Sequence, residues 1–141
     1  MAISIFSKDH LLSMTPKAGD AEELVKTAPH LADRLEEMGA ASILTADGKT
    51  VLGVMGAVPT LPGVCEVFVL ASEAQARHPI TFAKAVRKEL YTLRAKYRRI
   101  QAVSRDDSFH SRWLRWLGFE REGLMRKYGL HGEDMVMWGL V

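Results

Sequence analysis

A strand, a long helix and a second strand follow one another between residues 64 and 104, and this succession constrains the fold most. Residues 64–70 form a nearly continuous apolar run, which is typical of a central strand covered on both faces. After a predicted loop, Pro79 opens the longest helical pattern of the chain, and residues 100–104 form the next strand. The apolar stripe of this helix comprises Phe82, Val86, Leu90, Leu93 and Tyr97. Strands joined by such a crossover run parallel with a right-handed connection, so the pattern predicts a βαβ unit.

Antiparallel strands are predicted before this unit. Residues 41–45 and 50–58 flank Asp47-Gly48, a dipeptide typical of a two-residue hairpin turn. Residues 3–6 have the pattern of a short edge strand, and residues 8–17 are expected to form a turn-like connection. The N-terminal part of the sheet is therefore expected to be an antiparallel meander.

Two short helices are predicted between the edge strand and the meander. Asp20 starts the first, because Glu23 follows at the spacing of a capping box. Pro29 separates the two helices, since a proline is unfavourable inside a helix, and Thr27 or Ala28 is the expected cap of the second. The apolar stripe and terminal glycine of the second helix are Leu31, Leu35, Met38 and Gly39.

Residues 105–119 predict a short helix that stops at a glycine and leads directly into a strand. Ser108 is the expected N-cap, with Asp106 and Asp107 at the helix end that favours negative charge. Gly118 tolerates the left-handed conformation in which many helices end. The expected buried stripe comprises Phe109, Trp113, Trp116 and Leu117.

The chain closes with a predicted hairpin. Residues 119–130 and 135–140 are its strands, and His131-Gly132 is its turn. The order of elements predicts an α/β (α+β) protein whose mixed sheet contains an antiparallel meander, a βαβ unit and a C-terminal hairpin. Because 141 residues without a repeat or linker suit one hydrophobic core, a single domain over residues 1–141 is expected.

Composition favours a soluble protein of the cytoplasm. Apolar residues make up 48% of the chain and charged residues 26%, as in ordinary globular proteins. No apolar run approaches the length of a membrane span, and no basic segment followed by an apolar run opens the chain. The single cysteine, Cys65, excludes an internal disulfide and a cysteine-cluster zinc site, and its apolar strand favours a buried spectator thiol. No metal is expected.

Charge is distributed unevenly along the chain. Residues 1–76 carry five Lys and Arg against ten Asp and Glu, whereas residues 77–127 carry fourteen against five. A positive half of this kind suits phosphates of a nucleotide cofactor or a nucleic acid, or an acidic protein surface, and solvated helix faces explain it equally well. Nucleic-acid binding by residues 94–99 with Arg112 and Arg115 is the weaker alternative, because the interleaved aromatic residues fit a core better.

The order of elements resembles the GNAT acyltransferase fold over nearly the whole chain. The most specific part is Trp113-Leu-Arg-Trp-Leu-Gly-Phe119 followed by Glu122-Gly-Leu-Met-Arg-Lys-Tyr128, which is similar to the family's fourth helix and the strand after it. The resemblance implies that an acyl-CoA, acetyl-CoA above all, binds in a splay between the strand ending near Leu70 and the strand at Ile100. Backbone N–H groups at the start of the long helix would hold the pyrophosphate, and an amide of the splayed strand would polarise the thioester carbonyl.

The segment expected to bind phosphate departs from the family pattern. That pattern is Arg or Gln, two residues, Gly, any residue, then Gly or Ala. Neither Gln75 nor Arg77 starts a frame that supplies a glycine, and Pro79 removes one N–H donor. The residues at the glycine positions are His78 and Ile80 in the first frame and Ile80 and Phe82 in the second.

The fourth helix departs from the family as well. The family often has Asn at its start and Tyr seven residues later, and the Tyr can protonate the departing thiolate. Here Asp107 keeps a capping role, but Leu114 cannot donate a proton. Candidate catalytic substitutes are Glu66, as a general base directly or through water, and Tyr128. The alternative for Glu66 is an outward-facing strand carboxylate or a partner of a nearby arginine, and the alternative for Tyr128 is a cross-strand packing residue.

Side chains are the remaining candidates for holding the cofactor. The resemblance implies as cofactor-binding residues Leu70, Arg77, His78, Lys84 and Asp107. His110 lies on the fourth helix beside this expected site, although a lone histidine is more often structural than catalytic.

A narrower resemblance fits these departures. The pattern Asp107-Ser-Phe-His110 with Leu114, the basic long helix and the closing hairpin from Tyr128 to Trp138 are similar to the small GNAT-like proteins of T7-like podophages, described as internal virion or virion-assembly proteins. This resemblance implies a phage-encoded GNAT scaffold with an eroded acyl-CoA site, in the host cytoplasm or virion. It would be non-catalytic or weakly catalytic and would bind a virion or host protein through its basic surface. The alternative is an acetyl-CoA-dependent N-acyltransferase with an atypical phosphate loop.

Overall fold

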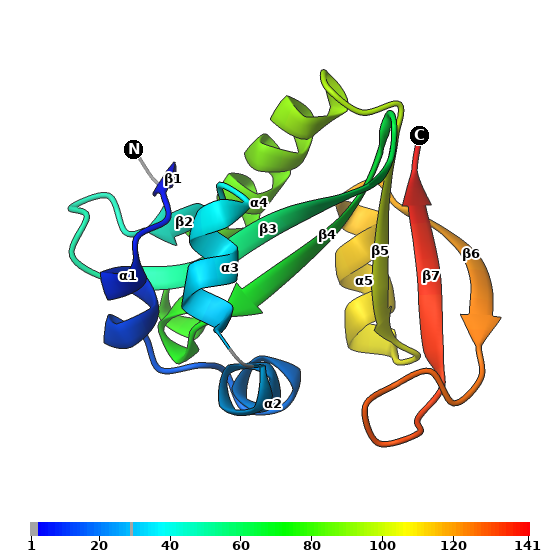
Figure 1. The fold of residues 1–141 in the computed structure, drawn as a ribbon, viewed down its shortest axis with the longest axis horizontal. Helices are drawn as coiled ribbons and strands as arrows, with labels where there is room; N and C mark the ends of the chain where they lie inside the picture. Colours follow the sequence, from blue (N-terminus) through cyan, green and yellow to red (C-terminus); the bar gives the residue numbers. More distant parts are fainter. Residues whose placement is uncertain (1–2, 29) are drawn as a thin grey trace. The chain divides into compact units, whose positions relative to one another are not determined.

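The computed structural model describes residues 3–28 and 30–141 (Figure 1). Pro29, the predicted helix break, lies outside the described residues. The elements in chain order are β1 (Ile3–Ile5), α1 (Lys8–Ser13), α2 (Asp20–Thr27), α3 (Leu31–Glu37), β2 (Ala41–Leu44), β3 (Val51–Leu61), β4 (Val64–Ala71), the 3-10 helix η1 (Glu73–Arg77), α4 (Pro79–Arg94), β5 (Arg99–Arg105), α5 (Ser108–Trp116), β6 (Glu120–Met125) and β7 (Met135–Leu140).

The strands form a mixed seven-stranded sheet in the order β1-β2-β3-β4-β5-β7-β6. Strands β1, β2 and β3 pair antiparallel, β4 and β5 pair parallel, and β7 pairs antiparallel with both β5 and β6. The parallel ladder joins residues 64–66 with residues 99–101. This arrangement confirms the predicted fold class, including the βαβ unit and the C-terminal hairpin.

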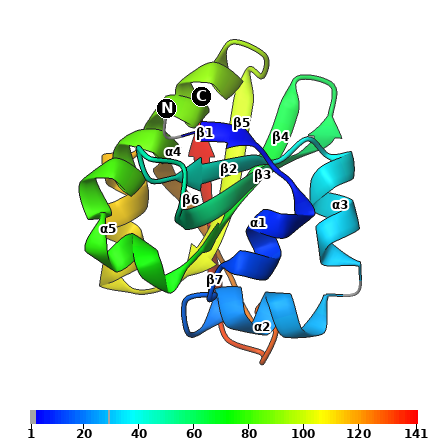
Figure 2. The same cartoon turned by 90° about the vertical axis from the view of Figure 1, so that its left-hand side faces the viewer.

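The chain divides into two compact units, so the single domain predicted over residues 1–141 stays a prediction. The first unit comprises residues 1–58 and 68–90. Figure 2 shows that α1 and α3 lie on one side of its strands and α4 on the other. Its core contains the fully buried Leu35 of α3 and Val54 of β3, packed with Phe6, Met14, Ala40, Leu44, Val51 and Leu70.

The second unit comprises residues 59–67 and 91–141. Residues along β5 alternate between half-buried and buried, as expected for a strand with one well-covered face. The buried residues of β5 pair with buried residues of β7, and Trp138 lies opposite Ala102. Helix α5 adds Leu114 and Leu117 to this core. Burial raises the pKa of the Cys65 thiol, in keeping with the spectator role predicted for it.

Two local predictions in the N-terminal half are wrong, namely the turn-like connection after β1 and the cap of the second short helix. Residues 8–13 form a helix instead of a turn, and the Ser7 N–H donates to His10 Nδ1 at 3.2 Å, a capping contact made by His in place of Glu or Gln. Helix α2 begins at Asp20 as predicted, although its N-cap is Gly19. His30, in the left-handed region at φ 55°, precedes α3 in place of the predicted cap Thr27 or Ala28.

The turn predicted at Asp47-Gly48 is a longer loop. The Thr45 N–H donates to the Thr50 carbonyl at 3.0 Å, so residues 46–49 form the loop. The Asp47 carboxylate accepts hydrogen bonds from the Thr45 hydroxyl at 2.6 Å and from the Lys49 N–H at 3.0 Å. These bonds favour a wider turn over the two-residue hairpin.

The predicted apolar stripe of α5 is only partly correct. Leu117 is buried as expected, but Phe109 and Trp116 are exposed, and Leu114 takes the central buried position. The rings of Trp113 and Trp116 stack with centroids 5.9 Å apart. The buried side of the helix is therefore the side that carries Leu114 and Leu117. The N-cap is Asp107 instead of Ser108, which confirms the capping role expected for Asp107 from the family resemblance.

The first strand of the C-terminal hairpin is shorter than predicted and the connection is longer, whereas the second strand, predicted over residues 135–140, is confirmed as β7. Strand β6 ends at Met125, and residues 126–134 form a loop before β7. Gly132 lies in this loop at φ 80°, and its N–H donates to the Gly129 carbonyl. Hydrogen bonds within the loop therefore replace a tight turn at His131-Gly132.

Candidate functional site

The segment from Ser72 to Phe82 in the first unit is the one expected to hold a cofactor pyrophosphate. The Ser72 hydroxyl oxygen accepts from the Ala74 N–H at 3.0 Å, which caps η1. The His78 N–H donates to the Gln75 carbonyl at 3.0 Å, and the Phe82 N–H donates to the His78 carbonyl at 3.0 Å. Several amides of this segment therefore donate to acceptors within the segment itself.

The side chains proposed to bind phosphate lie in or just after this segment. Arg77 and His78 are exposed at the end of η1, and Lys84 is exposed on the second turn of α4. They belong to the same unit and are open to solvent. Leu70 of the same unit is buried in the core, so only its backbone is a candidate for contact with a thioester.

Glu66 lies in a chain of hydrogen bonds that crosses the second unit. Gln101, its neighbour in the β4–β5 ladder, donates from Nε2 to Glu66 Oε1 at 3.1 Å. Arg99 in turn donates from Nε to Gln101 Oε1 at 3.2 Å. The amide of Gln101 thus connects the Glu66 carboxylate with the Arg99 guanidinium.

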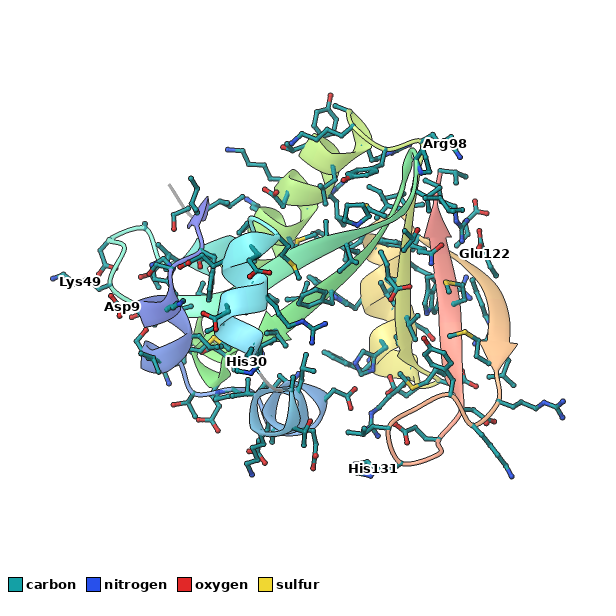
Figure 3. All side chains as sticks on the ribbon, in the orientation of Figure 1. Asp9, His30, Lys49, Arg98, Glu122 and His131 are labelled. Carbon is teal, nitrogen blue, oxygen red and sulfur yellow. The ribbon has the colours of Figure 1, made fainter. Side chains whose placement is uncertain are left out.

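The chain of hydrogen bonds continues from Arg99 to Glu122 of β6, which is labelled in Figure 3. Two parallel hydrogen bonds join the guanidinium to the carboxylate at 2.9 and 2.6 Å. These hydrogen bonds hold the pKa of Glu122 below its ordinary value. A Cβ on Gly139 would overlap the Glu122 carboxylate, so the bare backbone of β7 provides the space for this pair.

The polar chain from Glu66 to Glu122 contains three residues that sequence reasoning missed: Gln101, Arg99 and Glu122. The available signal was the pair of polar residues two apart on β5, which places both side chains on one face of the sheet. The pairing of β6 with β7 shifts register between Arg121 and Gly123, which leaves Glu122 outside the regular ladder. No pattern in the sequence indicates this shift.

Tyr128 lies outside the strand in which it was expected. It belongs to the loop after β6 and is exposed. A cross-strand packing role therefore does not apply, and a catalytic role for Tyr128 and for Glu66 stays a prediction.

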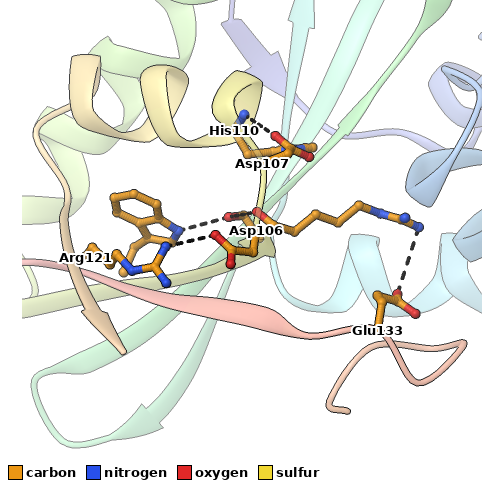
Figure 4. A network of polar contacts seen from close by, with 8 residues as sticks. Asp106, Asp107, His110, Arg121 and Glu133 are labelled. Carbon is orange, nitrogen blue, oxygen red and sulfur yellow. Dashed lines mark hydrogen bonds and ion pairs between the residues drawn. The ribbon is translucent and has the colours of Figure 1, made fainter. Parts of the chain in front are cut away.

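Asp107 and His110 form a compact pair at the start of α5 (Figure 4). Asp107 Oδ1 accepts from the His110 N–H at 2.7 Å, and His110 Nδ1 lies 2.8 Å from Asp107 Oδ2. Partial burial raises the pKa of Asp107, but the hydrogen bonds from His110 outweigh this effect and hold the pKa below its ordinary value of 3.8. Asp107 thus caps α5 and is held by the His110 side chain, and a cofactor-binding role for Asp107 stays a prediction.

Replacing Asp107 with alanine is expected to lower the free energy of unfolding by about 1 kcal/mol at pH 7. Because the folded-state pKa is lowered, the electrostatic part of this difference is present above the ordinary value of 3.8 and is lost as the pH falls through the lowered pKa. Denaturant unfolding at pH 7 and pH 3 measures it. Asp107→Asn, which keeps an acceptor, is the control, and an equal loss for both variants would contradict capping by the acceptor oxygen.

Comparisons with known proteins give similarity in structure alone. No protein-family model matches the sequence, and no curated protein matches it. The structure is similar to Ard1 from Thermoplasma volcanium, with a TM-score of 0.75 at 14% identity over 99% of this chain and 97% of that chain.

Two further solved structures are similar over almost their whole length. A GNAT-family acetyltransferase from Bacillus anthracis has a TM-score of 0.74 at 15% identity, covering 99% of this chain and 93% of that chain. A Bacillus subtilis acetyltransferase in complex with CoA has a TM-score of 0.71 at 15% identity, covering 98% of this chain and 96% of that chain. None of the helices that the structure describes has the length and apolar character of a membrane span. At these identities the similarity establishes the architecture, and this chain has the GNAT fold.

Proposed function

We propose that this protein is a GNAT scaffold that has lost efficient acetyl transfer and acts by binding another protein, in virion assembly or in contact with a host. The observation that supports this proposal best is the hydrogen bonding of the segment from Ser72 to Phe82. A pyrophosphate cradle needs several backbone N–H groups that point outward at one anion. Here the N–H groups of Ala74, Gln75, His78 and Phe82 donate to Ser72, Gln75 and His78 within the segment.

Side chains at the glycine positions support the same proposal. His78 and Ile80 carry a Cβ where the family pattern has glycine, and Pro79 between them has no N–H to offer. Leu114, which replaces the family tyrosine, is buried in the second unit and carries no proton for a thiolate. The phage context is supported by the resemblance in α5 and the closing hairpin. The partner would bind to the basic residues of the C-terminal half.

The second candidate function is acetyl-CoA-dependent N-acyl transfer. It is favoured by the similarity to a Bacillus subtilis acetyltransferase that was solved with CoA. It is also favoured by Glu66, a half-buried carboxylate held in place by Gln101. In this function Arg77, His78 and Lys84 would hold the phosphates by side chain instead of by backbone, and acetyl-CoA would supply the acyl group.

Isothermal titration with acetyl-CoA is expected to give no saturable heat up to millimolar cofactor, because four amides of the segment already have acceptors and Pro79 has no N–H. The triple variant His78→Gly/Pro79→Ala/Ile80→Gly restores the family pattern in the frame from Gln75, and a gain of binding is expected from it. Lys49→Gly, in a separate exposed loop, is the control and should gain nothing.

Micromolar binding by the unaltered chain that is lost in Arg77→Ala would overturn the proposal and establish the second candidate function. Lys49→Ala is the charge-matched control for Arg77→Ala, since both remove one exposed cation from the first unit. Binding lost equally in both variants would indicate general charge attraction, and the proposed loss of the specific site would stand.

A further inference from the structure

A short segment between α1 and α2, residues 15–17, pairs with the end of β4 in the first unit. The Lys17 N–H donates to the Ala71 carbonyl at 2.8 Å. The Glu73 N–H donates to the Thr15 carbonyl, also at 2.8 Å. Residues 15–17, named the strap below, therefore act as a short additional strand beside the end of β4.

The strap covers a strand edge that no other strand pairs with at this point. Ser72, which is 2% exposed, donates its N–H to the Leu52 carbonyl of β3 at 2.9 Å. Because backbone groups of alternate residues point to opposite edges of a strand, Ala71 and Glu73 present theirs to the edge away from β3. The ladder of β4 with β5 covers residues 64–66 and does not reach this far. The strap is thus the neighbour of β4 at its end.

Pro16 makes the strap a poor partner for any further strand. It lies opposite Ser72 in an antiparallel bridge, and its neighbours Thr15 and Lys17 make the two hydrogen bonds toward β4. The nitrogen and the carbonyl of Pro16 therefore face the other edge, away from β4. A proline has no N–H to offer there, and prolines within sheets are confined to such edges. A very short strand and a proline are two devices by which proteins protect a sheet edge.

Both flanks of the strap hold it in place. Met14, which precedes it, is 7% exposed and belongs to the core cluster that contains Leu35 and Leu70. At the other end, the Glu22 N–H of α2 donates to the Lys17 carbonyl at 3.2 Å. The strap is therefore fixed by the core and by α2 as well as by its two hydrogen bonds to the end of β4.

We propose that the strap is an edge guard, which closes this edge of the first unit to strand addition by a second copy of the chain. An uncovered strand edge is a template for pairing with another strand. Two identical edges fit each other, because antiparallel strands related by a two-fold axis exchange the same N–H and C=O groups. The proposal concerns self-association and is independent of the proposed loss of acyl-CoA binding.

Pro16→Val tests the outer edge of the strap in the full chain. It keeps both hydrogen bonds to β4, supplies the missing N–H and favours an extended backbone. Self-association measured by analytical ultracentrifugation is expected to strengthen about tenfold relative to the unaltered chain, as one added backbone hydrogen bond would give. Pro62→Val, which replaces an exposed proline in the turn between β3 and β4, is the matched control and should leave self-association unchanged. Equal association of the two variants, or none in Pro16→Val, would overturn the proposal.

Lys17→Pro tests the edge beneath the strap. It removes the donor to the Ala71 carbonyl, so the Glu73 amide, which donates to Thr15, should exchange its hydrogen about tenfold faster in dilute monomer. At higher concentration the variant should self-associate, and the Glu73 amide should become protected again because a second copy supplies its acceptor. Ala18→Pro, which places the same ring just beyond the strap, is the control and should show neither effect. The proposal fails if Glu73 exchanges equally in both variants, or if Lys17→Pro associates without renewed protection of Glu73.

Discussion

Replacing Trp138 with alanine is expected to lower the free energy of unfolding by about 4 kcal/mol. Trp138 is fully buried in β7, where it lies between Ala102 of β5 and Arg121 of β6. Its Nε1–H donates to the Ser104 hydroxyl at 2.9 Å, and the Arg115 guanidinium lies 5.6 Å from the ring centroid. The variant removes the largest buried side chain of the second unit together with both of these contacts. Urea unfolding followed by far-UV circular dichroism measures the loss.

Trp138→Phe separates the volume of the ring from its polar contact. It keeps an aromatic ring on β7 and removes the N–H, and Ser104 keeps its hydrogen bond to the Arg105 carbonyl. A loss of about 1 to 2 kcal/mol is expected, which is the usual range for one buried hydrogen bond and a small cavity. If Trp138→Phe lowered the free energy of unfolding as much as Trp138→Ala does, packing of the ring would not be the main contribution of Trp138.

The elements that sequence predicted best are those whose signal is local and strong. The apolar run of β4 and the helical stripe of α4 each repeat one pattern over enough residues to define an element and its buried side. The end of α4 is less distinct, because the N–H groups of Lys96 and Tyr97 both donate to the Leu93 carbonyl. The predicted stripe reaches Tyr97, whereas the observed helix ends three residues earlier, at Arg94.

The face of α5 was predicted less well because periodicity identifies a repeat without saying which side the sheet contacts. Phe109, Trp113 and Trp116 are spaced as an apolar stripe, yet the residues buried at this helix are Leu114 and Leu117. A Cβ on Gly118 would lie 3.4 Å from Leu140 Cδ1, which shows how closely the end of α5 approaches β7.

The polar chain of the candidate site depends on pairings that are distant in sequence. Glu66 meets Gln101 only through the parallel register of β4 and β5, 35 residues apart. Arg99 meets Glu122 only because the register of β6 shifts beside it. Neither contact leaves a local pattern, so a strand carboxylate paired with an arginine was the most that the sequence could predict for Glu66. The structure inserts Gln101 between them, and this amide limits the freedom of Glu66 in either proposed function.

Replacing Gly53 with alanine is expected to lower the free energy of unfolding by about 2 to 3 kcal/mol. Gly53 lies in the middle of β3, and an added Cβ would lie 2.9 Å from the Leu70 carbonyl oxygen and 2.9 Å from Phe82 Cε1. The carbonyl belongs to the backbone of β4 and cannot rotate away as a side chain can. The variant must therefore separate β3 from β4 or move the start of α4 in the first unit.

Gly123→Ala is the matched control for Gly53→Ala, since Gly123 also lies in a strand and an added Cβ would meet no atom within 4 Å. Its effect is expected to stay within about 0.5 kcal/mol. The double variant Gly53→Ala/Phe82→Leu removes the Phe82 ring but leaves the Leu70 carbonyl in place. It should therefore recover only a minor part of the free energy of unfolding lost in Gly53→Ala. Full recovery in the double variant would show that the Phe82 ring, and not the backbone of β4, requires a glycine at this position.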